Sequence, residues 1–256
     1  MAATVRMIAA LALFLAGSAH AAGCFPVAGL GLQPIPAALP AGATLQLTFL
    51  GHSTFLIETA EGVTAVTDYN DYVRAPVTPT IVTMNNAHDT HYSNHVEPGV
   101  AHVLRGWSPT GGAAEHDVTV RDLRVRNVPT AVRGRVGDEA LGNSIFVFET
   151  ADLCVAHLGH LHHVLLDVQL GEIGQIDVLL VPIDGVYTMS QEEMVQVIEQ
   201  IAPAVVIPMH YFGAERLSRF LGLMGKRWQV EMAASPVLPL SRATLPWRVV
   251  IVLPGR

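Results

Sequence analysis

The chain has 256 residues, of which 50% are hydrophobic and 14% are charged. This composition suits one sizeable core and excludes a disordered tail, and the two cysteines exclude a mini-protein held by several disulfides. The formal net charge is −7 and the basic side chains are scattered, so no positive stripe is available for nucleic acid or an anionic membrane. The unusual feature is histidine. Of 12 histidines, seven lie between His88 and His95 or between His157 and His163.

The first 21 residues have the pattern of a secretory signal peptide. Arg6 precedes an apolar run over residues 7–16, and Ala19, His20 and Ala21 form the small-residue pattern that signal peptidase recognises. The run is too short to span a bilayer, which takes about 20 residues, and no later stretch is long enough. We therefore expect a periplasmic or secreted protein with no transmembrane segment.

The residues around Cys24 leave two further alternatives open. Ala21 to Cys24 resembles a lipobox, which would attach a lipid anchor to Cys24, although a large aliphatic residue is missing where Ala21 stands. In an oxidising compartment, Cys24 and Cys154 could instead form a disulfide.

Predicted strands dominate the first half of the chain, after an irregular lead-in over residues 22–44 that is rich in Ala, Pro and Gly. Short runs of apolar and β-branched residues, separated by turn residues, indicate these strands. The predicted strands are Leu45 to Leu50, Ser53 to Glu58, Thr64 to Thr67, Thr80 to Thr83, Leu123 to Val128, Ser144 to Glu149 and Leu153 to His157.

Strands and helices alternate in the second half. The helix that begins near Ser190 has the clearest pattern, because Ser190 and Glu193 form a capping box and apolar residues recur at helical spacing after them. The predicted elements are a helix Leu165 to Ile173, a strand Val178 to Val181, a helix Ser190 to Ile201, a strand Val205 to Ile207, a helix Glu215 to Met224 and a strand Arg248 to Leu253. No linker divides residues 45–256, so we predict one domain of two sheets covered by helices.

Histidines follow predicted strands at three separate places. His88 and His91 come after one strand, His160 follows the strand that ends at His157, and His210 follows a third. Loops at strand ends often carry ligands, and neutral imidazole is the commonest metal ligand. For one window alone, surface histidines bonded to loop carbonyls would be an equal explanation. Three strand ends that each finish in histidine favour a shared metal site.

These motifs, in this order, resemble the metallo-β-lactamase superfamily, in its lactonase-like branch of metal-dependent hydrolases. The resemblance covers residues 45–212, and the segments that carry it are Phe49 to Glu58, Thr67-Asp68, His157-Leu-Gly-His160, Leu179 to Met189 and Pro208-Met-His210-Tyr211. It implies an α+β fold, an αββα sandwich of two mixed β-sheets flanked by helices. It also implies a metal site at one edge between the sheets, and hydrolysis by a metal-activated water.

Several positions depart from the family pattern. In the H-x-H-x-D-H motif, Asn86 stands in place of the first histidine and Thr90 in place of the aspartate. His160 replaces the aspartate that usually bridges two metals, and the segment around Thr130 offers no counterpart to the middle histidine ligand. One ion is therefore expected, with two not excluded.

The predicted metal ligands are His88, His91, His160 and His210, with His157 as an outer candidate and Asn86 at the first ligand position of the motif. Zinc is the expected divalent ion, with iron or manganese as alternatives. A carboxylate is needed to accept a proton or to orient a ligand, and Asp184 and Asp89 are the nearest candidates. Asp184 is equally well explained as a turn residue before Gly185, and Asp68 is expected to orient a histidine or to hold a loop. His52, His162 and His163 stay unassigned, and His95, His102 and His116 are expected on the surface or in loops.

These residues predict a secreted or periplasmic metal-dependent hydrolase that acts on a small ester, lactone or phosphoester. The alternative is a non-catalytic member of the same fold that binds metal or a small ligand, because Asn86, Thr90 and His160 replace family ligands. Hydrolysis of β-lactams fits the expected compartment but depends on analogy of fold alone.

Overall fold

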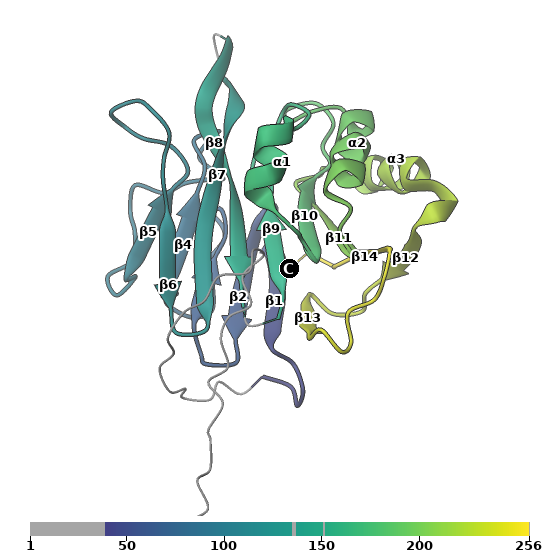
Figure 1. The fold of residues 1–256 in the computed structure, drawn as a ribbon, viewed down its shortest axis with the longest axis horizontal. Helices are drawn as coiled ribbons and strands as arrows, with labels where there is room; N and C mark the ends of the chain where they lie inside the picture. The colour runs from purple at the N-terminus through teal and green to yellow at the C-terminus, as the bar shows by residue number, and fades with distance from the viewer. Residues whose placement is uncertain (1–38, 135–136, 151, 256) are drawn as a thin grey trace, which may run out of the picture.

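The computed structural model describes residues 39–134, 137–150 and 152–255 (Figure 1). The predicted signal peptide, most of the lead-in and Cys24 lie outside the described residues, so the lipid anchor and the disulfide stay predictions. In the described part of the chain, no helix is long and apolar enough to cross a membrane.

Two β-sheets stack against each other, and the predicted α+β sandwich is confirmed. The first sheet has six strands in the order β13-β1-β2-β3-β4-β5, and the second has eight in the order β12-β14-β11-β10-β9-β8-β7-β6. The first contains β1 (Leu45–Gly51), β2 (Thr54–Thr59), β3 (Thr64–Val66), β4 (Ile81–Met84), β5 (His102–Arg105) and β13 (Val237–Leu240). The second contains β6 (Asp117–Val120), β7 (Leu123–Gly134), β8 (Gly137–Glu149), β9 (Cys154–His157), β10 (Val178–Pro182), β11 (Val205–Met209), β12 (Gln229–Met232) and β14 (Val249–Val252). Both sheets mix parallel and antiparallel pairs.

The core between the sheets is built from alternate residues of their strands. Leu47 and Ile57 of the first sheet belong to the same buried cluster as Phe146 and Leu180 of the second. In β10, the intervening residue Leu179 faces the helices instead. Because both faces of β10 are covered, its sequence is a continuous apolar run, as in most buried parallel strands.

The helices α1 (Asp167–Ile173), α2 (Gln191–Ile201) and α3 (Ala214–Met224) cover the outer face of the eight-stranded sheet, and a short 3-10 helix, η1 (Gly225–Arg227), follows α3 (Figure 1). The predicted capping box begins α2: the Ser190 hydroxyl accepts the Glu193 N–H at 3.2 Å, and the Glu193 carboxylate accepts the Ser190 N–H at 3.0 Å. The described outer face of the six-stranded sheet is covered instead by non-helical segments that include Tyr69 and Trp107. The described helical layer is therefore one-sided.

Four strands were not predicted: β5, β6, β12 and β13. They are the edge strands of the two sheets. An edge strand packs against one neighbour only, so its sequence needs less of the apolar alternation that reveals an inner strand. β12 is exposed along its whole length, which is the extreme case. The hairpin of β7 and β8 is also twice as long as predicted, with 12 and 13 residues in its two strands.

Candidate metal centre

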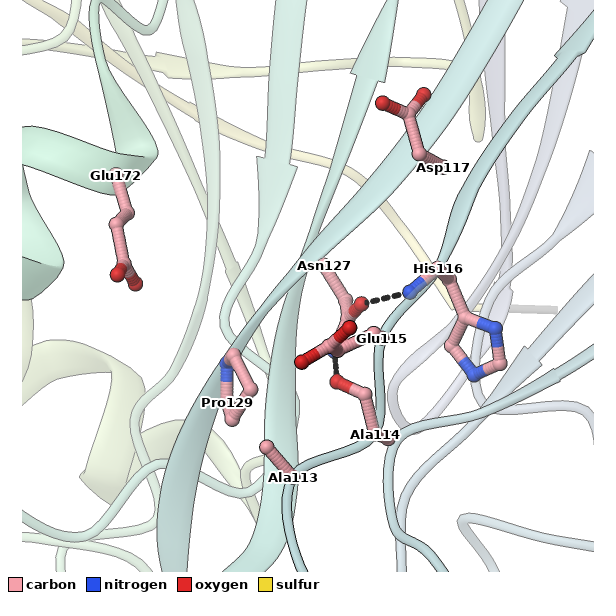
Figure 2. A pocket seen from close by; sticks show the side chains of 8 residues that line it. All are labelled: Ala113, Ala114, Glu115, His116, Asp117, Asn127, Pro129 and Glu172. Carbon is pink, nitrogen blue, oxygen red and sulfur yellow. Dashed lines mark hydrogen bonds between the residues drawn. The ribbon is translucent and has the colours of Figure 1, made fainter.

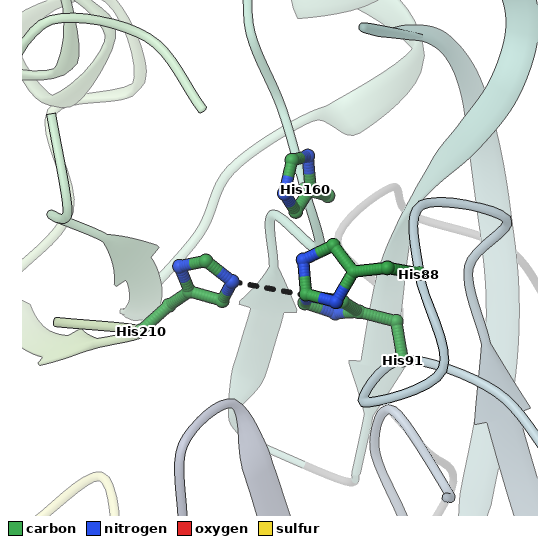
Figure 3. A group of neighbouring side chains, drawn as sticks. All are labelled: His88, His91, His160 and His210. Atoms are coloured by element: carbon green, nitrogen blue, oxygen red, sulfur yellow. Dashed lines mark hydrogen bonds between the residues drawn. The ribbon is translucent and has the colours of Figure 1, made fainter. Parts of the chain in front are cut away.

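Four histidine rings meet at one edge of the sandwich, between the two sheets. Each ring offers one nitrogen that could bind a metal, and these four atoms all lie within 4.8 Å of one another (Figure 3). His88 and His91 follow β4 of the first sheet, whereas His160 and His210 follow β9 and β11 of the second. Since β9, β10 and β11 run parallel, their carboxyl ends share one edge of the sheet, and this edge meets the end of β4. The structure thus brings together His88, His91, His160 and His210 as the sequence predicted, while their role in binding metal belongs to the proposal below.

The orientation of His91 is fixed by Asp68. Its Nδ1 lies 2.6 Å from the Asp68 carboxylate, and both side chains are completely buried. Asn85 donates a hydrogen bond of 3.0 Å to the other carboxylate oxygen. Burial opposes ionisation of Asp68, but His91, His157 and Asn85 outweigh it and hold the pKa of this carboxyl well below its usual range. An ionised Asp68 keeps the proton of His91 on Nδ1 and leaves Nε2 as a free lone pair.

Asp184 does the same for His210. Its Oδ2 lies 3.0 Å from His210 Nδ1 and accepts the Thr188 hydroxyl at 2.6 Å. Its Oδ1 accepts the backbone N–H groups of Val186, Tyr187 and Thr188. Burial raises the pKa of Asp184, but the bonds from His210, Thr188 and the backbone outweigh burial, and the net shift is downward. The contacts of Asp184 fit a residue that orients a histidine and holds the turn that follows it. They do not fit a proton acceptor in the reaction, because its oxygens are already occupied.

The donor set suits a bound cation. His91 Nε2 and His210 Nε2 face each other at 3.1 Å, and both are lone pairs once their Nδ1 atoms donate to carboxylates (Figure 3). His160 is 3% exposed, and among the described residues neither of its ring nitrogens has a hydrogen-bond partner. Burial of an unpartnered polar group is costly, whereas a shared divalent ion would satisfy all of these nitrogens. The residues present therefore fit a metal.

Two of these histidines, His88 and His160, are also in the protonation state that a metal requires. Burial is the main cause that lowers the pKa of His88 to about 4 and that of His160 to about 2, and mutual repulsion between the neighbouring rings adds to it. At neutral pH both rings are therefore neutral, and a neutral imidazole offers a lone pair.

His157 does not join the group, although it was predicted as an outer ligand. Its Nε2 lies 2.8 Å from the Ser53 carbonyl oxygen, and its Nδ1 accepts the Gly159 N–H at 3.1 Å. Both ring nitrogens are thus bonded to backbone, and the ring bridges the two sheets. We therefore leave His157 out of the candidate ligands.

For the two other predicted residues, Asp89 and Asn86, the structure describes contacts away from the group. Asp89 is exposed and accepts the Tyr72 hydroxyl at 2.5 Å, so its contact is on the surface rather than with the histidines. Asn86 follows β4, and its backbone N–H donates to the Gly142 carbonyl at 3.0 Å. This bond ties the start of the histidine loop to β8.

His52 is the residue that sequence reasoning missed. It lies in the turn between β1 and β2, and its ring centroid is 4.2 Å from that of His210 and 5.4 Å from that of His91. Its Nε2 lies 3.0 Å from the Thr90 hydroxyl, which lies 2.8 Å from His88 Nδ1. The available signal was its place in the turn of the first hairpin, but nothing in the sequence shows that this turn meets the end of β11.

Gly159 leaves room for two buried asparagines, one of which holds His160. Its φ is +60°, and an added Cβ would lie 2.4 Å from Asn85 Nδ2 and 2.5 Å from Asn143 Oδ1. That Asn143 oxygen accepts the backbone N–H of His160 at 2.8 Å. Only glycine fits this position, so the ring of His160 is positioned through its backbone.

A separate pocket of about 420 Å³ lies away from the histidine group (Figure 2). Several of its polar groups already bond to one another: Asn127 accepts the His116 N–H at 2.7 Å and donates to the Ala114 carbonyl at 2.8 Å. Asp117 is paired with Arg124 at 2.7 Å. The pocket therefore offers no cluster of free chemical groups comparable to the histidines.

Known proteins resemble this chain in both sequence and fold. A UPF0173 metal-dependent hydrolase of Archaeoglobus fulgidus is 30% identical over 194 residues, which cover 65% of this chain and 83% of that protein. A crystal structure from Thermotoga maritima, assigned as a Zn-dependent hydrolase of the metallo-β-lactamase superfamily, is 31% identical with a TM-score of 0.62, and covers 82% of this chain and 98% of that one. The metallo hydrolase Igni18 of Ignicoccus hospitalis shares the fold, with a TM-score of 0.55, 19% identity and coverage of 83% and 96%.

The family profile of the beta-lactamase superfamily domain matches residues 46–210, which run from the first strand to the last histidine of the group. The chain belongs to the beta-lactamase superfamily and has the metallo-β-lactamase fold.

Proposed function

We propose that this protein is a metal-dependent hydrolase whose His88, His91, His160 and His210 hold one divalent ion. The observation that carries the proposal is the convergence of these four rings, with the buried nitrogens of His160 left without another partner in the described part of the chain. Family membership and the hydrolase names of the relatives support the same reaction class. Zinc is the first candidate because neutral imidazole is a preferred zinc ligand, and iron or manganese are the alternatives.

The side chains around the site have distinct tasks in this proposal. A bound divalent ion lowers the pKa of a coordinated water toward 7, which supplies a nucleophile at neutral pH. Asp68 and Asp184 keep the ligand nitrogens of His91 and His210 unprotonated and aimed at the ion. Asn143 accepts the backbone N–H of His160 and so positions its ring, and Gly159 leaves the space that Asn143 needs.

The rim of the site favours a substrate with an apolar part. Phe212 is 58% exposed, and its ring centroid lies 5.9 Å from that of His210. Tyr187, 59% exposed, is 6.1 Å from Phe212. Large exposed aromatic side chains beside polar groups commonly bind ligands. We therefore propose a small ester, lactone or phosphoester with an apolar substituent, and a periplasmic or secreted location on the basis of the predicted signal peptide.

A non-catalytic metal-binding protein is the second candidate. Four imidazoles can complete a tetrahedral zinc shell, as in structural sites, whereas catalytic zinc sites usually have three protein ligands and keep one position for water.

One experiment separates these candidates. The purified protein is analysed for metal content and assayed on a panel of esters, lactones and phosphoesters, with and without a chelator. We expect one equivalent of metal and chelator-sensitive turnover, both lost in His88→Ala and His210→Ala. His95→Ala is the matched control, because its side chain is 84% exposed and lies outside the group. Stoichiometric metal without turnover on any substrate of the panel would support the non-catalytic candidate, and absence of metal would overturn both.

A further inference from the structure

We propose that His52 contacts the substrate: its Nδ1–H donates a hydrogen bond to the carbonyl or phosphoryl oxygen that gains negative charge during hydrolysis. This inference rests on the proposed function, since it assumes that the histidine group binds the ion.

The backbone places His52 firmly beside the metal centre. The His210 N–H donates to the His52 carbonyl oxygen at 2.7 Å, so the turn between β1 and β2 is attached to the loop that carries a candidate ligand. His52 has a φ of +55°, a left-handed conformation that residues other than glycine adopt only a few per cent of the time. Its ring lies against His210 and 5.8 Å from the exposed Phe212, so it neighbours both a proposed ligand and the aromatic rim.

The direction of the hydrogen bonds then follows from His88. Nδ1 of His88 is bonded to Thr90, so Nε2 is the atom left to bind a metal and must carry no proton. A neutral His88 therefore has its proton on Nδ1 and donates it to the Thr90 oxygen. Within the described residues, the Thr90 hydroxyl contacts one other acceptor, Nε2 of His52, and its single proton goes there.

This polarity determines the tautomer of His52. With Nε2 accepting from Thr90, the proton of the neutral ring lies on Nδ1. In the part of the chain that the structure describes, this Nδ1 makes no hydrogen bond and is not among the buried atoms that lack a partner, so it reaches solvent. An N–H donor that is fixed by its neighbours and open to solvent on a ring beside the site is suited to stabilise an oxyanion.

Thr90 is accordingly a positioning residue. It occupies the aspartate position of the H-x-H-x-D-H motif, and a carboxylate there would accept from His88 but could donate nothing to His52. The hydroxyl accepts from His88 and donates to His52, so the tautomer of His88 determines the tautomer of His52.

The first test is the tautomeric state of each ring, measured by nitrogen-15 NMR on the full chain as purified, with zinc bound. We expect His52 and His88 to carry their protons on Nδ1. A proton on Nε2 of His52 would overturn the inference without touching the proposed function, whereas failure of the wild-type protein to bind zinc, iron or manganese would overturn the proposed function itself.

The second test uses variants. Besides NMR, it measures zinc stoichiometry, kcat on a substrate of the panel, and the affinity for phenylphosphonate as an oxyanion probe. His52→Asn tolerates the left-handed backbone but is too short to reach the same position. We expect it to keep its zinc, to lose about 10²- to 10³-fold in kcat, as enzymes do on losing one oxyanion donor, and to bind phenylphosphonate more weakly. Thr90→Val should move the His52 proton and reduce kcat, and Thr90→Ser should restore both. Unchanged kcat and phosphonate affinity in a zinc-loaded His52→Asn protein would overturn the role of His52.

Discussion

The loop after β4 and the loop after β9 both carry closely spaced histidines, but the two loops use them differently. His88 and His91 of the first loop both turn toward the candidate metal centre. In the second loop only His160 does so, whereas His162 and His163, like His157 at the end of β9, bond to backbone. His162 Nδ1 lies 3.1 Å from the Ala131 carbonyl, and His163 accepts the Ala131 N–H at 3.3 Å.

The difference lies in what each ring nitrogen already contacts. Ala131 stands at a register shift between β7 and β8, where the regular pairing of the strands is interrupted. His162 and His163 bond to both of its backbone polar groups, and His157 connects β9 to the turn before β2. A surplus of histidine in the sequence therefore contains two populations, one that supports the fold and one that converges on a shared point. The predictions below test that division.

The largest contrast is expected between His160 and His157. His160→Ala removes a candidate ligand, so we expect zinc affinity to fall by more than the 10- to 100-fold that a supporting residue costs. The free energy of unfolding of the metal-free protein should fall less than in His157→Ala, because the lost ring had no hydrogen-bond partner among the described residues. His157→Ala should cost about 2–4 kcal/mol in that free energy, because it opens a buried cavity and leaves the Gly159 N–H without its acceptor. Zinc titration and urea unfolding of the two metal-free variants measure both effects.

If the two variants lose zinc affinity and stability to the same extent, the division between the populations is wrong. His157 would then act on the metal centre, or His160 would be part of the fold.

Zinc removal should destabilise the protein only through the histidines that converge on the candidate metal centre. At a zinc concentration 100 times the dissociation constant, binding to the folded state adds about 2.7 kcal/mol, which corresponds to about 5–10 °C in Tm for a domain of this size. Chelator should reverse this shift in the wild type and in His163→Ala. It should leave the Tm of His91→Ala unchanged, because that protein has no complete site to empty.

The sequence predicted the inner strands and the strand ends because both depend on local pattern. Apolar runs such as Val178 to Val181 and the capping box at Ser190 carry their own evidence. The missed strands are edges, where a strand such as β12 is determined by its pairing with β14 rather than by its own residues. Pairing of that kind is a long-range property of the chain.

The site followed the same rule. His88, His91, His160 and His210 could be predicted because each closely follows a strand. The positions of His52 and His157 depended on contacts across the sandwich, between the turn before β2 and the ends of β9 and β11. Neighbours in the sequence could not distinguish the ring that lies beside the metal centre from the ring that is tied to backbone.

Among the acidic residues, Asp184 and Asp89 provide a matched pair. Asp184→Asn places an amide N–H₂ where His210 donates, which turns the ring toward the wrong tautomer, so we expect a 10- to 100-fold loss of zinc affinity. Asp89→Asn removes the same charge from an exposed position whose described hydrogen bond is to Tyr72, and should change the affinity less than twofold. Equal losses in both variants would show that net charge near the site, rather than the orientation of His210, controls binding.

The smallest effect is expected from the histidines that hold the register shift. His163→Ala leaves the Ala131 N–H without its acceptor, in a partly exposed position, so the free energy of unfolding should fall by about 1 kcal/mol. Zinc stoichiometry, zinc affinity and turnover should match the wild type, since the ring lies outside the group. His163→Gln, which can still accept from Ala131, should recover part of the lost stability. Urea unfolding of the metal-free proteins resolves a difference of this size. A loss of zinc in His163→Ala would mean that the long hairpin of β7 and β8 is coupled to the metal centre through His160.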